Sequence, residues 1–350
     1  MDMETDNLKL RRLVIEAKVP FVAGVFEKHG VHVDYLPARD ITPEVMKDAD
    51  ALITRTRTRC DARLLAGSRC SMVATATIGT DHIDLDWCRD NGIATASAPG
   101  CNAPAVAQYV MACVLAHFGG DPTRLQGRRI GIIGVGHVGR IVDAWARSLG
   151  MTTLLCDPPR AEREGPEGFV EMDRIAREAD VVTVHTPLTD APQPWPTRHL
   201  LDEAFLGSLE RQPLVINCAR GPVASTEALI EAYRSGKASA LAIDCWEGEP
   251  AISLELLACA MVATPHIAGY SRQGKMRASQ MAVDAVTAHF GLPHIELPCG
   301  PAPVWPETVT AASILASYNP LADTAALKAA PEAFESLRDN YQLRNEPQCI

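Results

Sequence analysis

Three short stretches each place one chemically capable side chain directly after an apolar run. "NCARG" carries Arg220, "DCWEGEP" carries Glu249, and "TPHIAGY" carries His266. An arginine stays charged and grips a carboxylate through two parallel hydrogen bonds. A histidine has an ordinary pKa of about 6.5, and a carboxylate against one ring nitrogen fixes its tautomer. The three residues together suit proton transfer at an oxygen of an anionic substrate.

Each of these residues also has a simpler explanation. Arg220 could form a surface ion pair, Glu249 could be a solvated turn residue, and His266 could be a buried structural histidine or a metal ligand. The 11 cysteines are spread along the chain with no C-x-x-C motif and no tight Cys/His cluster, so no metal site is expected. Because all three residues follow successive predicted strands of one sheet, we favour the catalytic interpretation.

A glycine-rich turn lies in "RIGIIGVGHVGRIVDAWARSLG". Gly134, Gly136 and Gly139 stand between a predicted strand and a predicted helix, with His137 and Val138 at the helix start. In that context the first glycine permits the tight turn, the second lets the backbone approach a pyrophosphate, and the third lets helix and strand pack closely. The positive end of the helix dipole then favours the diphosphate of a dinucleotide.

Asp157 stands 18 residues after Gly139, at the end of the apolar run "TTLLC". An acidic side chain there accepts hydrogen bonds from the adenosine ribose hydroxyls and repels a 2'-phosphate, so NAD is favoured over NADP. The alternative is an aspartate that caps a helix or turn before Pro158. Arg160 is the nearby group that argues for a phosphate instead.

The elements that must position these residues follow an α/β pattern with two doubly wound parallel-sheet domains. Strand-like runs such as "RRLVIEA", "ADALITRT" and "SMVATATIG" alternate with helical stretches, and the alternation continues through "ADVVTVHTPL", "PLVINCARG" and "SALAIDCWEGEP". In an open parallel sheet, ligands bind beyond the carboxyl ends of the strands. The polar residues that follow these strands are therefore expected at one edge.

The domain boundaries follow from the longer helices and from one Pro-rich stretch. We predict a first domain over 1–99, completed by about 268–290, and a Rossmann domain over 100–267. Helices are predicted from Asn102 to Phe118 and from about Ser271 to Phe290. "LPCGPAPVWPETV" indicates a linker, and 291–350 holds one clear helix around "PEAFESLRDNYQL" and is too short for an independent catalytic domain.

Charge and composition exclude some partners. The net charge is -10, which argues against nucleic acid or an acidic membrane surface, because both need clustered Lys and Arg. No run of about 18 apolar residues is present to span a bilayer, and the first residues are acidic where a signal peptide is basic. We expect a cytoplasmic protein whose cysteines are small buried apolar residues.

In order and spacing, "GVGHVGR", "CDPP", "HTPL", "NCARG", "DCWEGEP" and "TPHIAGY" resemble the D-isomer-specific 2-hydroxyacid dehydrogenases over roughly residues 11–290. The resemblance implies NAD-dependent oxidation of a 2-hydroxy acid, with 1–99 as the substrate-binding domain. Arg220 would orient the substrate, Glu249 would pair with the catalytic histidine, and His266 would transfer the proton. It also implies NAD contacts at Asp157, Thr186, Asp244 and Gly269, and substrate contacts at Thr56, Thr77 and Tyr270.

Within the family, "ATIGTDHID", "APGCNA", "LLCDPPR" and "HIAGYS" are similar to members that oxidise 4-phospho-D-erythronate to 2-oxo-3-hydroxy-4-phosphobutanoate in vitamin B6 biosynthesis. Such members end in a dimerisation domain and also pair through their nucleotide domains. The resemblance therefore implies a homodimer, with 291–350 as a shortened dimerisation region whose contribution to pairing stays open. Two alternatives stay open. One is another D-2-hydroxyacid dehydrogenase acting on phosphoglycerate, glycerate or lactate, and the other is a non-catalytic NAD-sensing interaction protein.

Two further stretches carry specific expectations. In "LITRTRTRC", a strand would send Thr54, Thr56 and Thr58 to one face and the intervening arginines to the other, and Thr56 is favoured for direct substrate contact. Gln108 stands where relatives usually have Glu. A neutral amide keeps most hydrogen bonds, so we expect the change to affect a contact between the domains rather than the chemistry.

Overall fold

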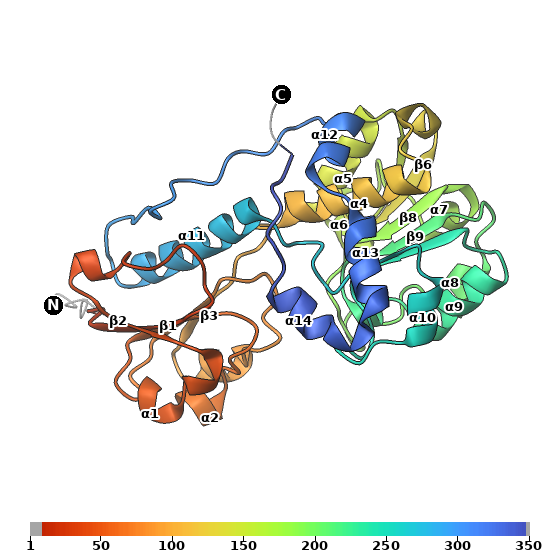
Figure 1. Ribbon diagram of the computed structural model, residues 1–350. Helices are drawn as coiled ribbons and strands as arrows, with labels where there is room; N and C mark the ends of the chain where they lie inside the picture. The colour runs from red at the N-terminus through yellow and green to blue at the C-terminus, as the bar shows by residue number, and fades with distance from the viewer. Residues whose placement is uncertain (1–8, 348–350) are drawn as a thin grey trace. The chain divides into compact units, whose positions relative to one another are not determined.

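Residues 9–347 are described in the computed structural model, and they divide into two units (Figure 1). The first unit comprises 9–102 and 272–303, and the second comprises 103–271 and 304–347. Most of the C-terminal region predicted as a separate part therefore belongs to the second unit.

The first unit is built on a five-stranded parallel sheet with the strand order β2-β1-β3-β4-β5. Its strands are β1 (Arg12–Glu16), β2 (His32–Leu36), β3 (Ala51–Thr54), β4 (Met72–Thr75) and β5 (Ala94–Ala96). Its α-helices are α1 (Pro43–Met46), α2 (Ala62–Leu65), α3 (Leu85–Asp90) and α11 (Arg272–His289), with 3-10 turns at Glu27–His29 and Ala38–Asp40. The helix predicted from Ser271 to Phe290 is present as α11.

Both faces of this sheet are covered, which explains the continuous apolar runs in its strands. Leu13 and Ile15 of β1 pack with the apolar side of α11, whereas Val14 between them packs with Met46 and Leu65 on the opposite face. Successive side chains of the strand thus point to opposite faces of the sheet and pack in two separate cores.

The alternation in "LITRTRTRC" does not continue as a strand, so that prediction is wrong. β3 ends at Thr54, because the buried carboxylate of Glu16 accepts the Arg55 N–H at 2.9 Å and the hydroxyls of Thr54 and Thr58 at 3.2 and 3.4 Å. These bonds turn the chain at the end of the sheet. Thr56 lies in this turn and is exposed, so it does not share a face with the other two threonines.

The second unit is built on a six-stranded parallel sheet with the order β11-β10-β9-β8-β6-β7. Its strands are β6 (Arg129–Ile133), β7 (Thr152–Cys156), β8 (Val181–Val184), β9 (Leu214–Asn217), β10 (Ala240–Ile243) and β11 (Val262–Ala263). Two doubly wound parallel-sheet units were predicted, and this part of the prediction is confirmed.

Helices lie on both faces of the second sheet. They are α4 (Ala103–His117), α5 (His137–Ser148), α6 (Pro158–Glu164), α7 (Met172–Glu178), α8 (Glu203–Gly207), α9 (Thr226–Arg234), α10 (Leu254–Cys259), α12 (Ala311–Ser317), α13 (Pro320–Ala329) and α14 (Phe334–Asp339), with 3-10 turns at Pro122–Leu125, Gly221–Val223 and Pro331–Ala333. One core joins the sheet to α4 and α5, and another joins it to α7, α8, α9 and α10. None of the described helices combines the length and apolar character needed to cross a bilayer.

The cysteines behave as small apolar residues, as predicted. All ten cysteines in 9–347 are free, and eight of them are buried. Cys113, for example, lies in the core around α4, and burial raises its thiol pKa above the ordinary value.

The C-terminal helices complete the second unit (Figure 1). α12 and α13 pack on α4, which is why α4 is buried on nearly all sides. α13 also covers the edge strand β11, where Thr324 Oγ1 accepts the Ala263 N–H at 3.0 Å. A parallel sheet edge would otherwise leave such groups unpaired.

Gln108 of α4 is explained by this C-terminal packing. Its amide nitrogen donates to Ser317 Oγ at 2.8 Å and to the Asn345 carbonyl at 2.9 Å, and its oxygen accepts from Arg344 Nε at 2.9 Å. A glutamate could not make the two donated bonds. These contacts lie within the second unit, so the predicted effect on a contact between the domains is not what the structure describes.

Arg344 is a buried cation that joins α4 to the turn after β11. It is 9% exposed, and its Nη atoms donate to the carbonyls of Ala105, Ile267, Ala268 and Tyr270. Its guanidinium lies 4.1 Å from the ring centroid of Tyr318. Arginine suits this position because its planar group presents five donors while one face stacks on an aromatic ring.

We predict that Arg344→Met lowers the free energy of unfolding by roughly 2–4 kcal/mol, because buried carbonyl groups lose their donor. The measurement is the midpoint of urea denaturation. Arg177→Met is the control, since Arg177 is exposed and forms a weak surface ion pair with Asp173 at 3.8 Å. This variant should change the free energy of unfolding by less than about 0.5 kcal/mol. Equal midpoints for the two variants would show that Arg344 does not hold the turn.

Candidate active site

The carboxyl ends of the second unit's strands gather the polar residues of the site. Because all six strands are parallel, the segments that follow them emerge at one edge of the sheet. The residues singled out from the sequence follow these ends in turn: Gly134 after β6, Asp157 after β7, Thr186 after β8, Arg220 after β9, Asp244 and Glu249 after β10, and His266 after β11.

The glycine turn has the geometry that a dinucleotide requires. Gly134 adopts a φ of 87°, in the left-handed region, and a Cβ on Gly139 would lie 2.2 Å from the Gly134 carbonyl oxygen. Both positions therefore need glycine. By contrast, a Cβ on Gly136 would meet no atom within 4 Å, so this residue faces open space at the start of α5. The N–H groups of the first turn, at His137 and Val138, have no intrahelical acceptor and can hold a diphosphate.

Asp157 caps a helix, which was the alternative to ribose binding, and its contact with the ribose stays a prediction. It is the N-cap of α6, with Oδ1 accepting the Arg160 N–H at 3.0 Å, and its Oδ2 accepts the Val135 N–H of the glycine turn at 2.8 Å. The cap therefore fixes the carboxylate of Asp157 beside the turn. The Arg160 guanidinium donates to Glu164 and to the Val135 carbonyl, so it is already engaged and does not argue for a 2'-phosphate.

Two polar side chains after β8 behave differently. Thr186 Oγ1 is buried and has no hydrogen-bond partner among the described residues, as expected for a group whose partner is a ligand. A Cβ on Gly134 would come within 3.0 Å of Thr186 Cγ2, which places Thr186 against the glycine turn. His185 is half-buried, and burial lowers its pKa to about 3, so the neutral form of its ring is favoured.

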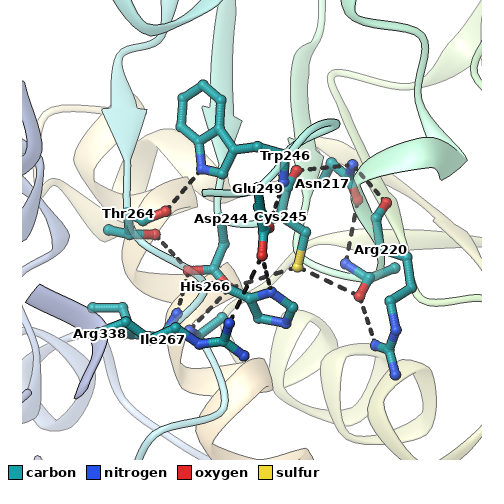
Figure 2. A network of polar contacts seen from close by, with 12 residues as sticks. Asn217, Arg220, Asp244, Cys245, Trp246, Glu249, Thr264, His266, Ile267 and Arg338 are labelled. Atoms are coloured by element: carbon teal, nitrogen blue, oxygen red, sulfur yellow. Dashed lines mark hydrogen bonds and ion pairs between the residues drawn. The ribbon is translucent and has the colours of Figure 1, made fainter. Parts of the chain in front are cut away.

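Glu249 and His266 form a hydrogen-bonded pair, and their proposed role in proton transfer stays a prediction. His266 Nδ1 lies 2.8 Å from Glu249 Oε2, and Glu249 Oε1 accepts the Trp246 N–H at 2.8 Å (Figure 2). Burial raises the pKa of Glu249, but the hydrogen bond and charge of His266, with the Trp246 N–H, outweigh it and leave the pKa below its ordinary value. An ionised Glu249 only accepts, so Nδ1 must carry the proton of this bond. In the neutral ring, Nε2 is then the nitrogen without a proton.

The backbone around His266 is held by the buried side chain of Asp244. His266 has a φ of 57°, which is unusual for a residue other than glycine. Asp244 Oδ1 accepts from Thr264 Oγ1 and the Ile267 N–H at 2.7 Å each, and Oδ2 accepts the Ala268 N–H at 3.0 Å. The Asp244 carbonyl also accepts the His266 N–H at 2.9 Å. These bonds stabilise the turn that presents the imidazole.

Arg220 is placed by a loop that presses on the Glu249 loop. Asn217 at the end of β9 donates to the Arg220 carbonyl at 3.1 Å and accepts the Ala219 N–H at 3.2 Å. A Cβ on Gly221 would lie 2.0 Å from the Trp246 carbonyl oxygen, so the two loops touch through this glycine. Figure 2 shows Arg220 in the same polar network as Glu249 and His266.

Cys245 adds a third group that could in principle ligate a metal. Its Sγ and ligand atoms of Glu249 and His266 lie within 4.8 Å of one another, a cluster that the spacing of the cysteines did not reveal. The thiol, however, donates to the Ala219 carbonyl at 3.4 Å, and burial raises its pKa well above the ordinary value. A metal needs the thiolate and would have to replace the Glu249–His266 bond. The arrangement therefore favours acid–base chemistry.

Tyr270 connects the site to the C-terminal helix α14. Its hydroxyl accepts from Arg338 Nε at 3.2 Å, and Arg338 Nη1 lies 3.9 Å from Glu249 Oε2. Arg338 was not singled out in the sequence, because an arginine in an amphipathic helix usually points to solvent.

Comparison with known proteins assigns the family. The family described as "D-isomer specific 2-hydroxyacid dehydrogenase, NAD binding domain" matches residues 113–268. An erythronate-4-phosphate dehydrogenase from Bacteroides thetaiotaomicron is 43% identical over 338 residues, covering 96% of this chain and 97% of the relative. The chain belongs to the D-isomer-specific 2-hydroxyacid dehydrogenase family. Residues 113–268 of the second unit match the NAD-binding domain of the family, and the protein is an NAD-dependent oxidoreductase.

Other relatives agree with this assignment. Erythronate-4-phosphate dehydrogenase from Porphyromonas gingivalis is 40% identical over 94% of this chain and 92% of its own length, and that from Serratia proteamaculans is 41% identical over 82% and 76%. A protein of known structure from Thermus thermophilus is 27% identical, with a TM-score of 0.69 over 81% of this chain and 99% of its own. D-lactate dehydrogenase from Aquifex aeolicus, at 23% identity and a TM-score of 0.66 over 80% and 95%, shares the fold.

The structure brings only some of the predicted site residues together. Glu249 bonds to His266, and Tyr270 is linked to the same pair through Arg338. Asp244 is turned into the protein, where it holds the backbone of the His266 turn, and its role toward NAD stays a prediction, as does that of Gly269. Thr56 and Thr77 belong to the first unit, where Thr77 Oγ1 bonds to Thr75 Oγ1 and the Gly79 carbonyl. Their contact with substrate also stays a prediction.

We predict that His266→Ala lowers turnover by at least about 100-fold, the range for loss of a general acid–base group, and leaves NADH binding nearly unchanged. Turnover and a fluorescence titration with NADH measure the two effects. His294→Ala is the control, because His294 is 68% exposed and pairs with Asp284 in the first unit. Loss of NADH binding in a folded His266→Ala protein would contradict the assignment.

Proposed function

We propose that this protein oxidises 4-phospho-D-erythronate to 2-oxo-3-hydroxy-4-phosphobutanoate with NAD, in vitamin B6 biosynthesis. The observation that carries this choice is identity of 43% with an erythronate-4-phosphate dehydrogenase over nearly the whole of both chains. The Glu249–His266 pair supplies the acid–base group that oxidation of a secondary alcohol requires. The presence of Tyr270 directly after the His266 turn supports the same choice among hydroxy acids.

The cofactor fits the second unit. The first-turn N–H groups of α5 would hold the diphosphate, Asp157 the ribose, and the buried Thr186 hydroxyl a further polar group of the dinucleotide. Bound there, NAD supplies the acceptor for the hydride that leaves C2 of the substrate.

The chain's own residues perform the other half of the reaction. Arg220 would hold the substrate carboxylate by parallel hydrogen bonds and orient C2. His266 Nε2 takes the proton of the C2 hydroxyl as the carbonyl forms, and the imidazolium that results is stabilised by Glu249 at Nδ1. Trp246 fixes the loop that carries Glu249, and Asp244 fixes the loop that carries His266, so the two side chains stay within hydrogen-bonding distance.

The C-terminal region supports the proposed homodimer. Ten large apolar side chains are exposed among the described residues, and five of them lie between 304 and 343: Val304, Trp305, Leu315, Leu321 and Leu343. Exposed apolar patches are typical of surfaces that bind another chain, and these five side chains are the candidates for such a surface. A homodimer paired through this region, acting in the cytoplasm on a small phosphorylated acid, completes the proposal, and a net charge of -10 speaks against nucleic acid as a partner.

The substrate assay tests the proposal. Purified protein with NAD should oxidise 4-phospho-D-erythronate with a kcat/KM at least about 100-fold above that for 3-phosphoglycerate, D-glycerate or D-lactate, since matched polar contacts discriminate by this order or more. The absorbance of the NADH that forms measures the rate. Preference for any other acid would replace the proposed substrate, and binding of NADH with no oxidation of the four acids would favour an NAD-sensing interaction protein.

A further inference from the structure

We propose that Arg338 of α14 binds the phosphate group of the substrate, with the Tyr270 hydroxyl beside it. This inference rests on the proposed function and assigns a phosphate-binding role to the C-terminal segment, which the sequence predicts as a dimerisation region. Arg338 and Tyr270 both belong to the second unit, as do Glu249 and His266.

The position of Arg338 is built by the fold. α14 is anchored by Phe334, which is 1% exposed in the core that also contains α9 and α10, and Leu337 packs partly against that core. The Arg338 side chain is 22% exposed and reaches the reacting pair, with Nη1 3.9 Å from Glu249 Oε2. Figure 2 shows its guanidinium directed toward the Glu249–His266 pair, on the other side of His266 from Arg220 in this view.

The guanidinium keeps donors available for a ligand. Its Nε is used by the Tyr270 hydroxyl at 3.2 Å. Its Nη groups make no hydrogen bond to any of the residues 9–347, since the approach to Glu249 at 3.9 Å is longer than a hydrogen bond. Neither Nη atom is a buried unsatisfied group, so both reach solvent at the site. Two N–H groups in one plane match two oxygens of a phosphate.

The charge of the reacting groups favours the same role. Without Arg338, the charge of Arg220 is offset by that of Glu249, which is ionised as derived above. A substrate with a carboxylate and a phosphate brings about two and a half to three negative charges. Arg220 would bind the substrate carboxylate, and Arg338 would supply a second cation for the phosphate. A monoanionic hydroxy acid would not need this second cation.

The alternative is that Arg338 only positions Glu249. A residue that positions the pair would affect oxidation of phosphorylated and unphosphorylated substrates alike, whereas a phosphate-binding residue affects only the phosphorylated one. The two roles therefore separate in a comparison of substrates.

The experiment measures kcat/KM for 4-phospho-D-erythronate and for D-erythronate in the wild type, Arg338→Met and Arg338→Lys. We expect Arg338→Met to lower kcat/KM for the phosphorylated acid by roughly 10- to 100-fold and for D-erythronate by less than about threefold, the range of one charge-assisted hydrogen-bonding group. Arg338→Lys keeps the charge but loses the planar donor pair, so its loss should be smaller. Competitive inhibition by inorganic phosphate should weaken in the same order.

Arg234→Met is the matched control, because Arg234 is 59% exposed and pairs with Glu255 on the surface, and it should leave both substrates and phosphate inhibition unchanged. Equal losses for both substrates with unchanged phosphate inhibition would overturn the inference. If Arg338→Met does not fold, Arg338→Lys and phosphate inhibition decide. If the wild type oxidises another acid but not 4-phospho-D-erythronate, the proposed function fails. If it oxidises 4-phospho-D-erythronate, and Arg338→Met prefers this acid over D-erythronate as strongly as the wild type does, only this inference fails.

Discussion

The hydrogen bond between Glu249 and His266 is the interaction on which the arrangement of the loops in the second unit depends. It requires two loops from neighbouring strands, β10 and β11, to meet within 2.8 Å. Each loop is therefore fixed separately. Trp246 donates its N–H to the far oxygen of Glu249, and Asp244 accepts the N–H groups that follow His266. The left-handed backbone at His266 is maintained because these bonds surround it.

The C-terminal segment stabilises this arrangement from outside the sheet. Arg344 donates to the carbonyls of the His266 turn. The hydrogen bond between Gln108 and Ser317 joins the C-terminal segment to α4, and α13 covers the edge strand that precedes the turn. Ser271 Oγ donates to Glu346 Oε1 at 2.7 Å, in a buried contact at the end of the same turn. The segment thus supports the turn that carries His266, and through Arg338 it also adds a charge beside Glu249.

Much of this organisation could be predicted from the sequence because it depends on local patterns. The glycine turn, the helix α4 and the long helix α11 follow from spacing and apolar periodicity. The order of Arg220, Glu249 and His266 along successive strands placed them at one edge. Arg338 and Arg344 could not be predicted. Arg344 contacts Ile267, 77 positions away, and nothing in "QLRNE" distinguishes a buried arginine from an exposed one. The alternation in "LITRTRTRC" predicted a longer strand than the structure has, because the carboxylate of Glu16, 39 positions before Arg55, ends the strand.

The most direct test is the tautomer of His266, read from the ¹⁵N chemical shifts of its imidazole. Protein labelled with ¹⁵N-histidine has ten such side chains, and comparison with His266→Gln assigns the relevant pair of signals. We predict that neutral His266 carries its proton on Nδ1 and leaves Nε2 unprotonated, and that Glu249→Gln weakens this preference. A neutral His266 protonated on Nε2 would mean that Glu249 does not accept the bond, and it would contradict the assignment of His266 as the proton acceptor.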